Sequence, residues 1–80
     1  MDKFFSTLVS FGINPQNIKL VSSSKYKLTF IFIYNERLVE ISIIRSLMKD
    51  EDIFYFDWKY KKESGRAYSI EELANDIKSV

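Results

Sequence analysis

The chain of 80 residues has room for one domain, over residues 1–80, and too little length for a second hydrophobic core. The content of 46% hydrophobic and 16% aromatic residues argues against disorder. The net charge is +1, from 12 Lys and Arg and 11 Asp and Glu, and this balance disfavours both a bulk polyanion binder and an acidic nucleic-acid mimic. With no Cys and no His, the chain lacks disulfides, thiolate nucleophiles and imidazole bases or metal ligands.

The N-terminal segment predicts an amphipathic helix over residues 2–12. Asp2 is suited to cap its start, and Gly12 is suited to a left-handed residue at its end. Its apolar residues recur at helical spacing, and they are Phe4, Phe5, Leu8 and Val9. The segment has neither a cleavage site nor a basic face, so we expect a core-covering helix rather than a signal peptide or a membrane-surface helix. No stretch approaches the roughly 18–20 apolar residues of a membrane span, and we expect a cytoplasmic protein.

The central part of the chain predicts strands over residues 17–22, 26–34 and 37–45, because apolar and polar residues alternate there. The last two form a hairpin if Asn35 and Glu36 are a two-residue turn. Asn suits such a turn and Glu suits it less well than Gly, so a four-residue loop with the same register stays open.

The two-residue turn sets the register of the hairpin. It places Phe32 opposite Val39 and Phe30 opposite Ile41, which are aromatic–β-branched pairs on one face. A slip by one residue would move this apolar row against polar side chains, so the pattern enforces the register.

Residues 46–52 predict a polar connection. Its acidic residues 50–52 are candidates for a hard cation such as Mg²⁺, but they lack the spacing of a calcium loop, and we expect a solvated loop with no metal. Residues 53–62 predict a further strand whose apolar row joins the aromatic face, and Ser64 with Gly65 predicts a turn.

Residues 69–79 predict a second helix, because Ser69 and Glu72 form a capping box ahead of an apolar stripe. The order of elements predicts a small α+β domain: an antiparallel sheet of three to four strands, a β-meander at its centre, with an N-terminal and a C-terminal helix packed on it. The helices either share one face of the sheet or take one face each.

The carboxylate pair best placed for acid–base catalysis is Glu40 with Asp57. Both are expected near Lys27 and Lys59, so cross-strand salt bridges explain them better. We therefore expect a protein that is not an enzyme and that needs no cofactor.

The hairpin also carries apolar residues on the face opposite to its aromatic row. They are Ile31, Ile33, Leu38 and Ile44. A solvated face would be more polar, so either the N-terminal helix covers these residues or another molecule contacts them. An apolar centre with a charged rim is typical of protein interfaces, and the partner is another protein or a second copy of the chain. Tyr and Arg are common at hot spots, and those available at the rim are Tyr34, Arg37, Arg45 and Tyr55. Glu36 is a further candidate because we expect the hairpin turn to contact the partner as well.

A nucleic-acid-binding small domain is the alternative. The basic end of the fourth predicted strand and the segment after it would contact phosphates, with Tyr55 as a stacking platform. The basic residues are Lys59, Lys61, Lys62 and Arg66. The aromatic–glycine motif of RNA-recognition sheets is missing, and the charge is balanced, so protein recognition is the preferred prediction.

In size and in its richness in Lys, Ile, Phe and Tyr, the chain resembles the small proteins of phages and mobile elements from AT-rich genomes. Many of those proteins, anti-CRISPR proteins among them, inhibit a host enzyme by occupying its surface. The resemblance implies an inhibitor that acts by surface complementarity on a host protein.

Overall fold

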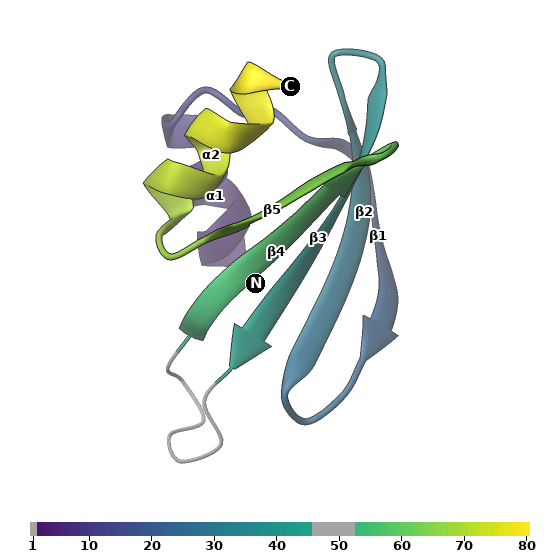
Figure 1. The fold of residues 1–80 in the computed structure, drawn as a ribbon, viewed down its shortest axis with the longest axis vertical. Coiled ribbons are helices and arrows are strands. Elements are labelled where there is room, and N and C mark those ends of the chain that lie inside the picture. Colours follow the sequence, from purple (N-terminus) through teal and green to yellow (C-terminus); the bar gives the residue numbers. More distant parts are fainter. Residues whose placement is uncertain (1, 46–52) are drawn as a thin grey trace.

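A computed structural model describes residues 2–45 and 53–80 (Figure 1). Its elements are α1 (Asp2–Ser10), β1 (Gln16–Ser23), β2 (Lys27–Tyr34), β3 (Arg37–Arg45), β4 (Ile53–Tyr60), β5 (Glu63–Ala67) and α2 (Ile70–Ser79). The strands form one antiparallel sheet in the order β1-β2-β3-β4-β5, so each strand pairs with its neighbour along the chain. The expected α+β fold, with a meander and a helix at each end, is confirmed.

The described part of the sheet has five strands rather than three to four, because the segment after β4 is a strand and not a turn. The chain reverses at residues 61–62, where Lys61 takes a φ of 54°, so the strand predicted over residues 53–62 ends at Tyr60. The predicted turn at Ser64 and Gly65 is wrong, since both residues lie in β5.

Gly65 lies in this strand for a packing reason. It pairs with Trp58 of β4, and a Cβ added at Gly65 would lie 2.7 Å from three atoms of the indole ring. The ring therefore occupies the space that a larger residue would need.

The hairpin of β2 and β3 has the predicted register, with Phe32 opposite Val39 and Phe30 opposite Ile41. Its turn is the two-residue turn, in which Asn35 and Glu36 both have positive φ, 50° and 64°. Two successive left-handed residues are the signature of a type I′ turn, whose twist matches that of the strands it joins. The four-residue alternative is therefore wrong.

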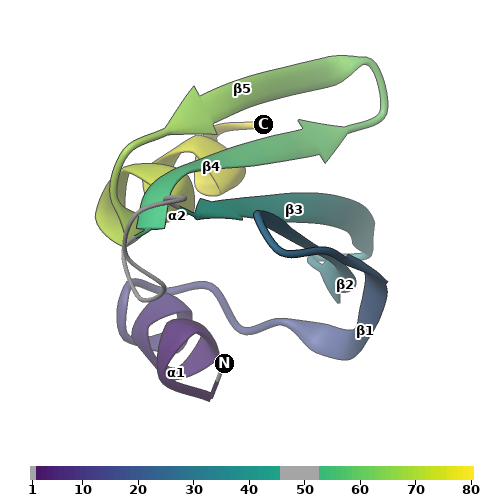
Figure 2. The same ribbon diagram turned by 90° about the horizontal axis from the view of Figure 1, so that it is seen from below.

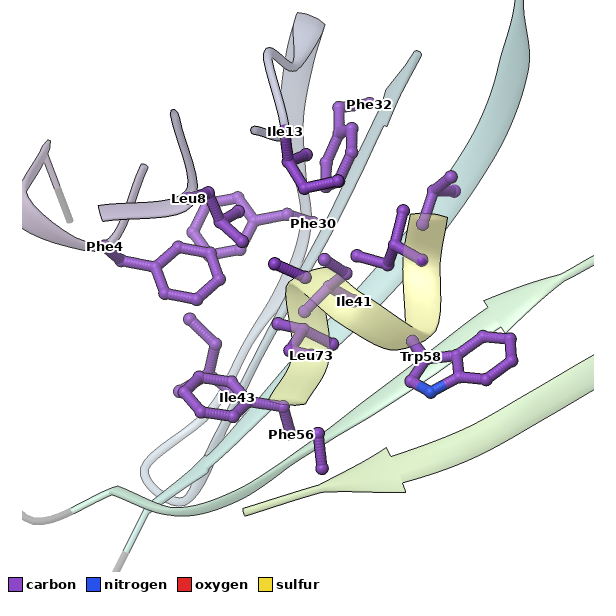
Figure 3. Close-up of a cluster of buried hydrophobic side chains, with 14 of the residues drawn as sticks. Phe4, Leu8, Ile13, Phe30, Phe32, Ile41, Ile43, Phe56, Trp58 and Leu73 are labelled. Carbon is purple, nitrogen blue, oxygen red and sulfur yellow. The ribbon is translucent and has the colours of Figure 1, made fainter. Parts of the chain in front are cut away.

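Both helices lie on the same side of the curved sheet (Figure 2). From α1, the Phe4 ring stacks on Phe56 at 5.5 Å between centroids, and Phe5 meets Phe30 edge to face at 5.3 Å. From α2, the residues buried in the same core are Leu73, Ala74 and Ile77. Figure 3 shows these layers meeting, with side chains from α1, α2 and the aromatic row of the sheet in one cluster. The helices thus share one face, which settles the choice that the sequence left open.

Polar contacts fix α2 at both of its ends. Ser69 caps its start by accepting a hydrogen bond from the Glu72 amide at 3.0 Å, as the capping box predicts. Near the end of α2, the Lys78 ammonium donates a hydrogen bond to the carbonyl of Phe11 at 2.8 Å. Phe11 follows α1 directly, because α1 ends at Ser10 and not at residue 12 as predicted. Two predictions lie outside what the structure describes. They are the helix cap formed by the side chain of Asp2 and the acidic loop over residues 46–52.

β1 is an irregular edge strand. Its pairing with β2 shifts twice, between Gln16 and Lys19 and between Leu20 and Ser22, and Asn17 has a φ of 54°. An extra residue at each shift bends and twists a strand. All eight residues of β1 are exposed.

Candidate protein-interaction surface

The outer face is the side of the sheet opposite the two helices. Because side chains alternate along each strand and the register joins the strands, the outer face consists of rows that run across the sheet. Along these rows lie Ile33 and Leu38; then Lys19, Ile31, Glu40, Lys59 and Ser64; then Ser22, Thr29, Ser42, Asp57 and Arg66; and last Lys27, Ile44 and Tyr55. Neither helix covers these rows, so the possibility that α1 covers the predicted apolar patch is ruled out.

An open groove, called here the outer groove, crosses the end of this face nearest the hairpin turn. Its lining residues are Asn17, Ile18, Lys19, Ile31, Ile33 and Leu38. Ile33 lies directly opposite Leu38, whose side chain is 59% exposed, and Ile18 is 42% exposed. The structure therefore brings three of the four predicted apolar residues together and adds a contribution from β1.

That contribution was missed from the sequence, although a signal was present. Asn17 takes a left-handed conformation at the first irregularity of β1, and Asn tolerates this conformation better than most residues. A regular strand would have alternated Ile18 and Lys19 to opposite faces, whereas both line the outer groove.

The fourth apolar residue, Ile44, lies apart from the groove. Between them runs the row in which Thr29 opposes Ser42, and the two hydroxyl oxygens are 3.0 Å apart in a buried hydrogen bond. Ile44 instead pairs with Tyr55 toward the other end of the sheet. Two hydrogen-bonded hydroxyl groups thus divide the predicted patch into the apolar outer groove and the Ile44–Tyr55 pair.

At the β4–β5 side of the outer face, the side chain of Arg66 contacts two neighbours. Its guanidinium carbon lies 4.0 Å from the centre of the Tyr55 ring, and its Nε donates to Asp57 Oδ1 at 3.0 Å. The hydrogen bond to Asp57 is the main reason why the pKa of Arg66 is raised above its ordinary value. The arrangement was missed because it requires β5, which the sequence did not predict.

This stack bears on the nucleic-acid alternative. A base would stack on a free aromatic face, but the guanidinium of Arg66 already lies over Tyr55. The structure brings Lys59 and Arg66 to one open groove on the outer face, together with Asp57, whereas Lys61 and Lys62 lie in the turn beyond β4. The four basic residues therefore do not form a single phosphate-binding patch.

The remaining candidates belong to the other face or to the turn. Tyr34 packs against the core on the helix side, and the guanidinium of Arg37 lies 5.4 Å from the centre of the Tyr60 ring. Glu36 is exposed in the hairpin turn. Tyr34 and Arg37 thus support the hairpin from the helix side, and Glu36 alone among these three is exposed.

The proposed carboxylate pair lies on adjacent strands, and both residues line one open groove, but they are diagonal neighbours rather than directly opposite each other. Glu40 lies opposite Lys59, and Asp57 lies opposite Ser42 and bonds to Arg66. Each carboxylate therefore has a cation as its neighbour. Within residues 2–45 and 53–80, no three acidic side chains gather in a way that would hold a metal ion.

Comparison of the chain with protein-family models, with curated proteins and with solved structures finds no match. Among the helices that the structure describes, none has the length and apolar character needed to cross a membrane.

Proposed function

We propose that the chain is a non-enzymatic protein-binding module that docks through its outer face, centred on the outer groove. In this proposal it acts by surface complementarity, as an inhibitor that occupies a surface of a host protein, in the manner of the small phage proteins that it resembles in composition. The main contact of the partner would be with the outer groove, and a second contact would be with the Arg66–Tyr55 stack at the far side of the outer face.

The observation that carries the proposal is the placement of both helices on one side of the sheet. This leaves apolar side chains on the other side, with Leu38 59% exposed beside partly buried Ile31 and Ile33. Contiguous apolar surface with a charged rim is typical of interaction sites. Arg66, stacked on Tyr55 and hydrogen-bonded to Asp57, adds a residue of a type that is frequent at hot spots.

The test compares two Leu→Asp variants with matched exposure. Leu38 is 59% exposed on the outer face, and Leu20 is 56% exposed on β1, opposite Phe30 on the helix side. The tagged protein, Leu38→Asp and Leu20→Asp are used to capture partners from a lysate of the cells that naturally contain the protein, with and without nuclease. A stoichiometric protein partner that survives nuclease, is kept by Leu20→Asp and is lost by Leu38→Asp is the expected result.

Circular dichroism of the three proteins is the control for their fold, and we expect the same spectrum from all three. Retention of the partner by folded Leu38→Asp would refute docking through the groove. Unfolding of this variant would show that the position is core, and Ile33→Asp then repeats the test at a neighbouring position.

Nucleic-acid binding is the second candidate, favoured by the meeting of Lys59 and Arg66 in one open groove. It requires that nuclease removes every partner. Lys59→Glu would then weaken binding of a fluorescein-labelled 20-nucleotide poly(U) strand, with a steep dependence on salt.

A further inference from the structure

The charge of the outer face differs from that of the chain as a whole. Its rows on β1–β5 carry four cations and two carboxylates, which leaves a net charge of 4 − 2 = +2. Residues 2–45 and 53–80, which the structure describes, hold 11 Lys and Arg and 8 Asp and Glu, a net charge of 11 − 8 = +3. The outer face therefore carries two of these three net positive charges, and the other described residues carry 3 − 2 = +1.

Two of these cations lie on the β1–β2 side of the outer face. Lys19 lines the outer groove. Lys27 lies opposite Ile44, on the far side of the Thr29–Ser42 row from the groove. Both are exposed, and neither has a carboxylate within ion-pair distance in the part of the chain that the structure describes, where the one ion pair joins Asp57 to Arg66. Carboxylates on a partner protein would give each of these two lysines an ion-pair partner.

A second copy of the chain fits this surface poorly. Two outer faces brought together would place +2 against +2, which opposes association. Addition of a strand to the edge of β1 is opposed by its two irregularities and by Lys19, since bulges and lysines are the devices that block pairing at a sheet edge. Ile18 of β1, which lines the outer groove, is therefore available to a partner that approaches the outer face rather than the edge of the sheet.

We propose that the partner is an acidic protein surface that inserts a large apolar side chain into the outer groove and places carboxylates against Lys19 and Lys27. This inference rests on the proposed function and specifies the chemistry of the partner. Lys19 and Lys27 set the preference for acidic partners, and Leu38 with Ile33 supplies the apolar contact.

The probe is a library of displayed random 12-residue peptides, selected on the immobilised protein and sequenced. The expected result is enrichment of peptides that combine Asp or Glu with Leu, Phe or Trp. Binding of an enriched peptide should weaken roughly threefold to tenfold in Lys19→Glu and in Lys27→Glu, and should weaken as salt is raised. The matched control is Lys3→Glu, the same charge change on the exposed side of α1, which should leave binding unchanged.

Four results would overturn the inference: no enrichment, enrichment without acidic residues, equal effects of Lys3→Glu and Lys19→Glu, or dimers in sedimentation equilibrium. Binding of the poly(U) strand that depends on Lys19 and Lys27 would also overturn it, because the partner would then be a nucleic acid. A captured protein that is lost by Leu38→Asp but kept by Lys19→Glu and Lys27→Glu would refute the inference and leave the proposed function standing.

Discussion

Replacement of Gly65 by Ala should destabilise the protein, although Ala is normally the better residue in a strand. The new Cβ would lie 2.7 Å from the Trp58 indole, whereas ordinary contacts begin at 3.4 Å, so the ring or the strand must move by about 3.4 − 2.7 = 0.7 Å. Trp58 has little room for this movement, because it is 8% exposed and its Nε1 donates to Asp76 of α2 at 3.2 Å.

The size of the effect follows from two opposed contributions. Overpacking of this kind costs about 1–3 kcal/mol, and the lower entropy of unfolded Ala relative to Gly offsets about 0.5–1 kcal/mol. We expect a net loss of about 1–2 kcal/mol in the free energy of unfolding. For a domain of this length, that loss lowers Tm by roughly 4–16 °C.

The assay is thermal unfolding followed by far-UV circular dichroism, with Ser64→Ala in the same strand as the control. Measuring the cost of Gly65→Ala again in the Trp58→Phe background completes a double-mutant cycle. This cycle isolates the clash, because Phe lacks the indole atoms that the Cβ would meet. Gly65→Ala should cost about 0.5 kcal/mol or less there. An unchanged or raised Tm in Gly65→Ala, or an equal cost in both backgrounds, would show that the ring does not restrict this position.

Three further substitutions test other parts of the fold. Glu36→Gly should stabilise the protein by about 0.5–1 kcal/mol, because Glu36 has a φ of 64° in the turn; a lower Tm would contradict this. Thr29→Val leaves the buried Ser42 hydroxyl without its partner and should cost about 1–3 kcal/mol in urea unfolding, and adding Ser42→Ala should recover most of the loss. Failure of that recovery would mean that packing, not the hydroxyl pair, explains the cost. Lys78→Met removes the hydrogen bond to the Phe11 carbonyl and should lower stability by about 1 kcal/mol, and an unchanged urea midpoint would refute that contribution.

The parts of the fold that the sequence predicted are those fixed by local patterns. The β2–β3 register followed from alternation and from Asn35 at the turn, and the start of α2 followed from Ser69. Each depends on residues close together in the chain, so a single stretch contains the information.

The fold features that the sequence missed depend on contacts between distant residues. Ser64 and Gly65 are typical turn residues, and only the ring of Trp58 explains a glycine within β5. The side taken by each helix also could not be predicted, because apolar residues occur on both faces of the hairpin and both faces would accept a helix.

The candidate site shows the same division. Ile31, Ile33 and Leu38 were placed together correctly because the hairpin register decides it. The separation of Ile44 follows from the same register, in which Thr29 opposes Ser42, but it requires knowing that these two hydroxyls are buried and bonded to each other.

The order of the strands also has a consequence for how the chain folds during synthesis. All sheet pairings join consecutive strands, so the sheet can form hairpin by hairpin, and such local pairings favour fast folding. The helix layer is different, because Lys78 reaches back across 67 positions to Phe11, and Leu73 and Ile77 complete the core from the last turns of the chain. Until those residues leave the ribosome, the aromatic face of the sheet is only partly covered. We therefore expect chains that end before α2 to aggregate, even though every strand is present.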